Sequence, residues 1–459
     1  MINTAIKLAT LLLIVLTAGC SRDREKPAVL AQVGDRLITM EDFVQRAEFS
    51  PERFIDGKEA GKQKLLEALI AEKLLAIEAE HRRLDQSPQM RQLTQFIEDL
   101  AVMRALFKNK VQSRIHLDPA QVQQAMAFSR QERKISWLSF RDKTTAEAWR
   151  QKWRSSSLQK ALQELQGGQA DTLQHQRSVT WGENDPALEA AVFSLTPGAL
   201  SPVLEQNGAF LVVRCDDISQ NVVATATSDA DLKTKVERVL TARQETQLRR
   251  RFVADFMQQQ QVVFDEKRVR RIIDRLVDLL FGDKSSMALE MKEIPVSKSV
   301  WQAATAELAA MQDEEVVRFK DGSLSAGELL ARWRRYRFPV DKSARAACAR
   351  SLNDQFSLVI RDVLLTREGR RRGLHKQPEV QKDKILWQDY YLAERLADDV
   401  GETGLSSLLS ELRETTAIRA DEPLLQKTEL TDIPVIALRP GQYASRVTPP
   451  WPDFSTVAQ

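Results

Sequence analysis

The residue types that most often carry chemistry are few and scattered in this 459-residue chain. The four histidines are far apart, with no i, i+4 pair and no cysteine nearby, and they are His81, His116, His175 and His375. The sequence has no glycine-rich phosphate loop, no Gly-x-Ser-x-Gly elbow and no His-Glu-x-x-His motif. We therefore expect no metal, no cofactor and no catalytic residue of these classes.

The most informative stretch runs from Val179 to Arg214. It consists of a strand candidate at 179–181, the turn Gly-Glu-Asn-Asp-Pro, a short helix at 187–194, the turn Ser201-Pro202-Val203 and a buried strand at 210–213. Upstream, KISWLS at 134–139 is typical of a strand, and a helix containing Trp149 and Trp153 follows it. Together these elements predict a small α+β domain at 129–218.

The order of residues in this domain resembles the parvulin family of prolyl isomerases. The family pattern in its second half runs roughly G-W-x(n)-P-x-hydrophobic-x-x-A-x-F-x-L-x-x-G-x-x-S-x-P-V-x-x-x-x-G-x-H. The resemblance implies an apolar proline pocket flanked by two histidines. It places Phe193 at the family phenylalanine, Leu188 on the same short helix and Ser201 at the family serine.

Neither family histidine is present at its expected place. The family pattern S-H-I-L is matched by Ser136-Trp137-Leu138-Ser139, and G-x-H is matched by Gly208-Ala209-Phe210. We predict a degenerate proline pocket without a catalytic residue, formed by Trp137, Leu188, Phe193, Ser201 and Phe210. The alternative for its apolar members is that they are core residues of a small domain.

Parvulin chemistry twists an X-Pro amide without covalent catalysis, against a barrier of ~18–20 kcal/mol. The enzyme must bind the twisted amide better than either planar isomer. Losing both histidines removes the polar pair and leaves an apolar cleft, which still binds apolar or proline-containing segments. We therefore expect a binding domain with little or no isomerase activity, and an active isomerase is the alternative.

The first twenty residues predict a targeting segment. Lys7 is followed by an apolar run at 11–16 and by Thr17-Ala18-Gly19-Cys20, which resembles the lipobox of bacterial lipoproteins. The resemblance implies a signal peptide at 1–19, a lipidated Cys20 and a tether at 20–28. Ser21 then implies the periplasmic face of the outer membrane of a Gram-negative cell. Ordinary cleavage with an unmodified Cys20 is the alternative.

Composition bounds the remaining possibilities. The length predicts about three domains, and 29% charged with 6% aromatic residues is typical of a soluble, mostly helical protein. The formal net charge of +3 gives no field that would favour nucleic acid. Cys215 and Cys348 are far apart in sequence, so we expect two buried free thiols, although a disulfide between them stays open.

An internal repeat organises the helical part. VGDRLITMEDFV, with Thr39 as helix N-cap and Asp42 three residues on, is matched by FKDGSLSAGELL, with Ser325 and Glu328 in those places. An ungapped offset of 290 also pairs Ile70 with Ile360, Pro88 with Pro378 and Asp99 with Asp389. The first copy resembles the N-terminal lobe of SurA- and PrsA-type extracytoplasmic foldases.

The predicted architecture is mainly α with an inserted α+β domain, that is, two helical lobes of the SurA N-terminal type plus one parvulin-like domain. The first lobe is expected at 29–128, helices completing it at 219–286 and the duplicated lobe at 287–412. A Pro-rich tail at 413–459 would either add an edge strand to the second lobe or stay extended.

These features predict a lipid-anchored periplasmic chaperone that binds unfolded or secreted polypeptides, with no nucleic-acid or metal partner. Each lobe's apolar faces would exceed what the lobe buries internally, which provides a surface for unfolded chains. Two alternatives stay open. One is an active prolyl cis/trans isomerase, and the other is an accessory lipoprotein of an export or assembly machine.

Overall fold

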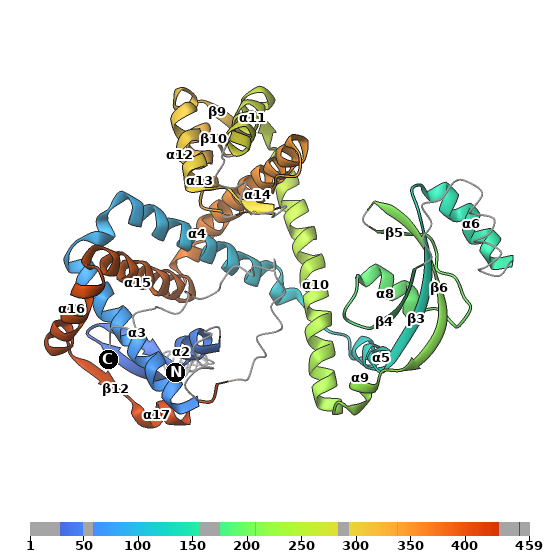
Figure 1. The fold of residues 1–459 in the computed structure, drawn as a ribbon, viewed down its shortest axis with the longest axis horizontal. Helices are drawn as coiled ribbons and strands as arrows, with labels where there is room; N and C mark the ends of the chain where they lie inside the picture. Colours follow the sequence, from blue (N-terminus) through green and yellow to red (C-terminus); the bar gives the residue numbers. More distant parts are fainter. Residues whose placement is uncertain are drawn as a thin grey trace, which may run out of the picture. The chain divides into compact units, whose positions relative to one another are not determined.

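The computed structural model describes residues 28–48, 58–155, 175–206, 208–282, 293–336, 338–430 and 449. The predicted signal peptide, Cys20 and almost all of the tether lie outside these residues, as does most of the Pro-rich tail. The chain divides into two compact units, Met1–Ala105 with Leu358–Gln459 and Leu106–Ser357 (Figure 1). None of the described helices combines the length and the apolar character that crossing a bilayer requires.

The first unit contains the first helical lobe. Its three-stranded antiparallel sheet has the order β12-β1-β2, with β1 at Val29–Val33, β2 at Arg36–Thr39 and β12 at Ile418–Ala420. Its helices are α2 (Met40–Glu48), α3 (Lys58–His81), the first part of α4 (Pro88–Lys110), the last part of α14 (Arg345–Arg371), α15 (Pro378–Val400), α16 (Glu402–Thr415) and α17 (Glu422–Lys427). The Thr39 hydroxyl accepts the Asp42 N–H at 3.2 Å, as expected for the N-cap of α2.

The C-terminal part of the chain completes this lobe, and not the helices at 219–286 that we expected to do so. Leu66 and Leu69 of α3 share one buried core with leucines of α15, α16 and α17, namely Leu392, Leu396, Leu405, Leu409 and Leu425. Residues 418–427, expected as part of a tail, form β12 and α17, and β12 pairs with β1 of the first lobe. Hydrophobic periodicity shows that a helix face is buried but not which partner covers it.

A close helix crossing fixes α4 against α14 within the first unit. The Asp99 carboxylate accepts the Arg370 guanidinium at 2.8 Å, and the Thr366 hydroxyl donates to the Asp99 carbonyl at 3.4 Å. Between these contacts Gly369 faces Val102, and a Cβ on Gly369 would collide with the valine methyl group. The absence of a side chain at Gly369 is what allows the two backbones to approach.

Gly369→Ala is therefore expected to destabilise the first unit by about 1–2 kcal/mol, because the clash outweighs the better helix propensity of alanine. Thermal unfolding followed by circular dichroism measures this loss. Gly282→Ala, near the end of a helix of the second unit and with open space around the added methyl, is the matched control. A Gly369→Ala variant as stable as the control would contradict the close crossing.

One part of the second unit, the duplicated lobe, repeats the plan of the first lobe. Its sheet has the order β10-β9-β7, with β7 at Val263–Phe264, β9 at Glu315–Phe319 and β10 at Gly322–Ser325. Its helices are α11 (Glu266–Gly282), α12 (Lys298–Glu307), α13 (Ala326–Trp333) and the first part of α14, and β8 (Glu293–Pro295) pairs with β11 (Pro339–Asp341). Ser325 and Glu328 form the predicted capping box at the start of α13. The sheet order matches that of the first lobe, with β9, β10 and β7 in the places of β1, β2 and β12. The bounds 287–412 expected for the duplicated lobe differ from those of the structure, because β7 and α11 precede residue 287 and because α15 and α16 pack in the first lobe.

The α+β domain also belongs to the second unit. Its antiparallel sheet has the order β4-β3-β6-β5, with β3 at Gln131–Phe140, β4 at His175–Thr180, β5 at Leu204–Gln206 and β6 at Ala209–Gln220. α6 (Lys143–Ser155) packs on one face of the sheet, where Leu138, Trp153 and Val212 are buried together. α8 (Pro186–Phe193) packs on the other face, over Ile135 and Val213.

The helices that follow the domain stay within the second unit. After α9 (Val222–Ala226), α10 (Asp229–Gln259) packs through Leu232 and Val236 on α5 (Pro119–Ser129), and α11 belongs to the second lobe.

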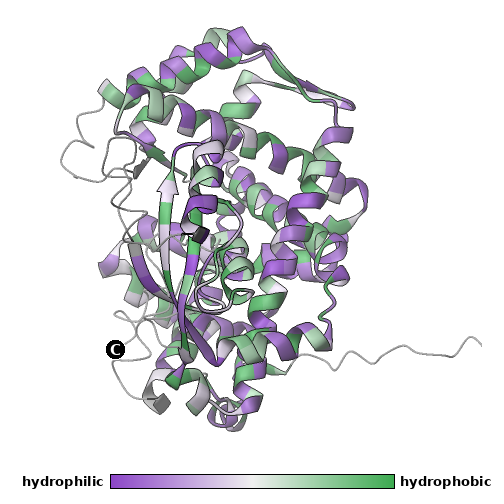
Figure 2. Ribbon diagram, turned by 90° about the vertical axis from the view of Figure 1, so that its right-hand side faces the viewer, coloured by the Kyte–Doolittle hydropathy of each residue, from purple (hydrophilic) through white to green (hydrophobic). Residues whose placement is uncertain are grey.

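Polar and apolar residues alternate along the long helices, as Figure 2 shows. Cys215 and Cys348 are buried free thiols.

Candidate functional site

A small apolar pocket lies on the α8 face of the four-stranded sheet. It has a volume of about 230 Å³ and is lined by Ile135, Trp137, Arg177, Leu188, Gln206, Leu211 and Val213. Alternate residues of a strand point to the same face, so β3 contributes the pair Ile135 and Trp137, and β6 contributes the pair Leu211 and Val213. Leu188 reaches the pocket from α8.

Local hydrogen bonds hold α8 over this pocket. The Asp185 carboxylate caps the helix by accepting the N–H groups of Ala187 and Leu188 at 2.9 and 3.2 Å. One turn on, the buried Glu189 carboxylate accepts the N–H groups of Gly182 and Asn184 at 2.9 and 2.8 Å. Glu189 also forms a 2.6 Å ion pair with Arg243 of α10. The helix and the preceding turn are therefore fixed before any ligand binds.

The pocket suits a single apolar side chain. Its volume lies below the roughly 300–1,000 Å³ typical of sites for drug-sized ligands. Five of the seven lining residues are apolar, and the Arg177 guanidinium lies 5.5 Å from the ring centroid of Trp137. Among the side chains that the structure describes around the pocket, none is a nucleophile or a histidine. These side chains can hold an apolar ring or chain.

Two of the five residues predicted for the pocket line it, Trp137 and Leu188. Phe193 lies in the buried core that supports the pocket, but it is not one of the lining residues. Its ring packs 5.2 Å from that of Phe128, and the Arg133 guanidinium lies 5.4 Å from its centroid. Phe193 is thus a core residue, which was the alternative interpretation of its position.

Ser201 and Phe210 lie elsewhere. The Ser201 hydroxyl accepts the Val213 N–H at 3.1 Å and donates to the Pro202 carbonyl at 2.6 Å, so it ties the loop before β5 to β6. The Phe210 ring packs on the opposite face of the sheet, in the cluster of Leu138 beneath α6. Placing Phe210 in the pocket was wrong by one residue, because successive strand residues face opposite sides.

Leu211 takes the pocket position on β6 that was expected for Phe210. The sequence carried the signal that would have identified it, since the apolar run at 210–213 can be divided by strand period into two faces. Arg177 and Gln206 had no such signal, because they are polar residues of flanking strands. Among the residues that the structure describes, no three His, Cys, Asp or Glu side chains come together as a metal-binding group.

The domain matches a known protein family. Residues 123–227 match the family model described as PPIC-type PPIASE domain. The chain is similar to the peptidylprolyl isomerase PrsA from Bacillus cereus, with 14% identity over 48% of this chain and 88% of that chain and a TM-score of 0.22. Foldase proteins PrsA from Streptococcus pneumoniae and Lactococcus lactis each match with 12% identity over 48% of this chain and 87% of theirs, at a TM-score of 0.20.

A comparison with curated proteins gives no significant match. The family match spans the four-stranded sheet, α8 and the pocket, and it confirms that the inserted domain is of the parvulin type. A parvulin-type domain between duplicated helical lobes supports a function of the foldase or chaperone class.

Proposed function

Because residues 123–227 form a PPIC-type domain, we propose that this chain binds unfolded or secreted polypeptides as a chaperone-like foldase and that its parvulin-type domain holds client segments with little or no isomerisation. The observation that carries the proposal is the lining of the pocket. Trp137, Leu188 and Leu211 offer apolar contact to a proline ring. Such contact depends little on the twist of the preceding amide.

Catalysis requires tighter binding of the twisted amide than of the planar one, and uniform binding does not lower the barrier. Apolar walls bind the proline ring in the planar and the twisted states to a similar degree. The pocket therefore favours affinity over rate acceleration, which is the behaviour of a binding domain.

The test combines two assays on the same purified chain. We expect it to suppress the aggregation of a chemically unfolded protein at stoichiometric concentration while leaving the proline-limited refolding rate of a second protein unchanged. Failure to suppress aggregation would contradict the chaperone function. In cells, cross-linking to a single stoichiometric partner in place of many clients would indicate instead an accessory subunit of an export or assembly machine.

One observation favours the alternative of an active isomerase. The β3–β4 ladder pairs Trp137 with His175, the first residue of β4, so the backbone brings a histidine position next to the pocket. If the chain accelerates proline-limited refolding and His175→Ala removes the acceleration, the domain is an isomerase that uses a histidine from a different strand position. If neither the unaltered chain nor the His175→Ala variant changes the refolding rate, the domain binds without isomerisation, as proposed.

The proposal includes a lipid anchor on Cys20 that holds the chain at the periplasmic face of the outer membrane in a Gram-negative cell. Thr17-Ala18-Gly19-Cys20 and the following Ser21 support it. Cys20→Ser is expected to abolish incorporation of labelled palmitate and to move the protein from the membrane to the soluble periplasmic fraction. Cys348→Ser, which removes a buried thiol, is the control that should retain the label.

A further inference from the structure

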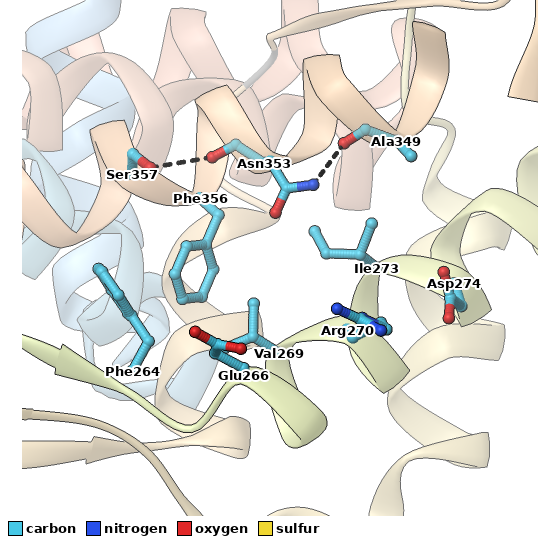
Figure 3. Close-up of a pocket in the computed structure, with 10 residues that line it drawn as sticks. All are labelled: Phe264, Glu266, Val269, Arg270, Ile273, Asp274, Ala349, Asn353, Phe356 and Ser357. Atoms are coloured by element: carbon cyan, nitrogen blue, oxygen red, sulfur yellow. Dashed lines mark hydrogen bonds between the residues drawn. The ribbon is translucent and has the colours of Figure 1, made fainter. Parts of the chain in front are cut away.

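A second and larger cavity lies in the duplicated lobe, between β7, α11 and α14 (Figure 3). Its volume is about 440 Å³, and we call it the α11–α14 groove. Five apolar residues line it, and they are Phe264, Val269, Ile273, Ala349 and Phe356. The rings of Phe264 and Phe356 lie 5.5 Å apart at an angle of 58°. Charged and polar side chains, among them Arg270 and Asp274, surround this apolar floor.

An open strand edge borders the groove. In the described residues β7 pairs only with β9, so its other side is an edge of the sheet. The Asp265 N–H donates to the Val316 carbonyl at 3.0 Å, and hydrogen-bonded pairs alternate along an antiparallel ladder. The next pair, Phe264 with Val317, is therefore the non-hydrogen-bonded kind. The N–H and C=O groups of Phe264 consequently point away from β9, toward the open edge.

The equivalent edge of the first lobe is built differently. β12 occupies the place of β7 there, and the registers put Arg419 at the position of Val263 and Ala420 at that of Phe264. A charged residue on an edge strand discourages further strand pairing. β7 instead exposes Val263 by 61% and Phe264 by 41%. Of these two equivalent edge strands, β7 is the one that combines free backbone groups with exposed apolar side chains at both positions.

We propose that β7 and the α11–α14 groove bind an extended client segment, which adds a strand to β7 and places an apolar or aromatic side chain in the groove, against Phe264 and Phe356. Unpaired backbone groups select an extended backbone, and the neighbouring cavity selects the side chain. The client residue that pairs with Phe264 must supply its own N–H, so proline is excluded there. This inference rests on the proposed polypeptide binding and assigns the duplicated lobe a proline-free part of the client.

The test uses a fluorescein-labelled, proline-free synthetic peptide of alternating valine and threonine with a central phenylalanine, titrated against the purified chain. Val263→Arg, which gives β7 the residue found on β12, is expected to weaken binding about tenfold through lost apolar contact and hindered strand pairing. Val222→Arg introduces the same charge at a valine that is 78% exposed and lies outside the groove, and it should bind as the unaltered chain does.

Two N-methylated peptides separate strand addition from simple apolar contact. Methylation of alternate amides along one edge of the peptide should reduce affinity about tenfold or more, whereas methylation along the other edge should not. These results do not depend on the folding of a variant. Equal binding of both methylated peptides, or equal binding by Val263→Arg and Val222→Arg, would overturn the inference.

A proline-containing peptide measured in parallel distinguishes the two proposals. If the proline-free peptide fails to bind while the proline peptide still binds, strand addition to β7 is wrong and the pocket proposal stands. If only the proline-free peptide binds, the duplicated lobe has the assigned role and the parvulin-type pocket does not.

Discussion

Asp389→Ala is expected to lower the free energy of unfolding of the first unit by about 3–5 kcal/mol. Asp389 is 1% exposed and accepts the Lys73 ammonium at 2.9 Å across the contact of α15 with α3. Lys73 also lies 3.2 Å from Glu72, which forms a 2.7 Å ion pair with Arg46 of α2. Removing Asp389 leaves the Lys73 charge buried with one carboxylate shared between two cations, and it also removes a carboxylate that lies 3.3 Å from the Arg36 guanidinium.

Urea unfolding of the purified variant measures this loss. The double variant Lys73→Met with Asp389→Leu should recover most of the stability, because apolar residues of similar volume replace a buried ion pair at little cost. Arg36, which loses its contact with Asp389, keeps its 2.7 Å ion pair with Glu80. A double variant no more stable than Asp389→Ala would mean that the loss reflects packing and not the unpaired charge. An Asp389→Ala variant within about 0.5 kcal/mol of the unaltered chain would contradict the importance of the pair.

The same buried charges predict how stability varies with pH. Burial raises the pKa of Glu72, but Arg46 and Lys73 outweigh it and lower the pKa overall. Burial lowers the pKa of Lys73, but Asp389 and Glu72 outweigh it and raise the pKa overall. Glu72 therefore contributes stability that is lost as pH falls below its ordinary pKa of about 4.3, and Lys73 contributes stability that is lost above about 10.4.

We expect a melting temperature that is flat near neutral pH and falls at both extremes. The double variant Lys73→Met with Asp389→Leu should lose part of the alkaline fall, because it has no ammonium to deprotonate at that site. If the melting temperature of the double variant falls at high pH as much as that of the unaltered chain, groups other than Lys73 cause the fall.

Trp137→Ala is expected to weaken the binding of a proline-containing peptide to the parvulin-type pocket by about thirtyfold. The indole forms a wall of the pocket, next to Leu188 and beneath Arg177. Truncating an aromatic anchor in an apolar pocket commonly costs 2 kcal/mol or more of binding free energy, which corresponds to that ratio. Fluorescence anisotropy of a labelled peptide measures the dissociation constant directly.

Trp149→Ala is the matched control for this substitution. It removes the same side chain from the same domain, but Trp149 packs on the opposite face of the sheet with Leu138 and Phe210. The control should bind the peptide as the unaltered chain does. Similar losses in both variants would indicate general destabilisation of the domain and would argue against the pocket as the binding site.

Features fixed by local sequence could be predicted. The N-caps Thr39 and Ser325 depend on hydrogen bonds to residues three positions away, so their pattern is visible in the sequence and the structure has both. The turn and the short helix before Phe193 are local in the same sense. Which face of its strand Phe210 occupies was predicted wrongly, because an error of one residue moves a side chain to the other face of the sheet.

The partners of long helices could not be predicted. Leu392 and Leu396 are spaced as a buried helix face, yet nothing in their spacing says that they pack on α3 and that their helix, α15, completes the first lobe. In a duplicated chain the choice between similar partners depends on specific contacts such as Lys73 with Asp389, which are distant in sequence. The open edge of β7 at Phe264 could not be predicted for the same reason, because the exposure of a strand edge depends on which strands pair.

The most direct test of the central claim, that the parvulin-type domain binds client segments without efficient isomerisation, is two-dimensional exchange NMR of a short Ala-Pro peptide. Uncatalysed exchange between its cis and trans forms takes tens to hundreds of seconds. With the chain present at saturating concentration, we expect peptide resonances broadened by binding and an exchange rate that is unchanged. Cis–trans exchange that the chain accelerates many-fold, and that Trp137→Ala slows again, would contradict the claim.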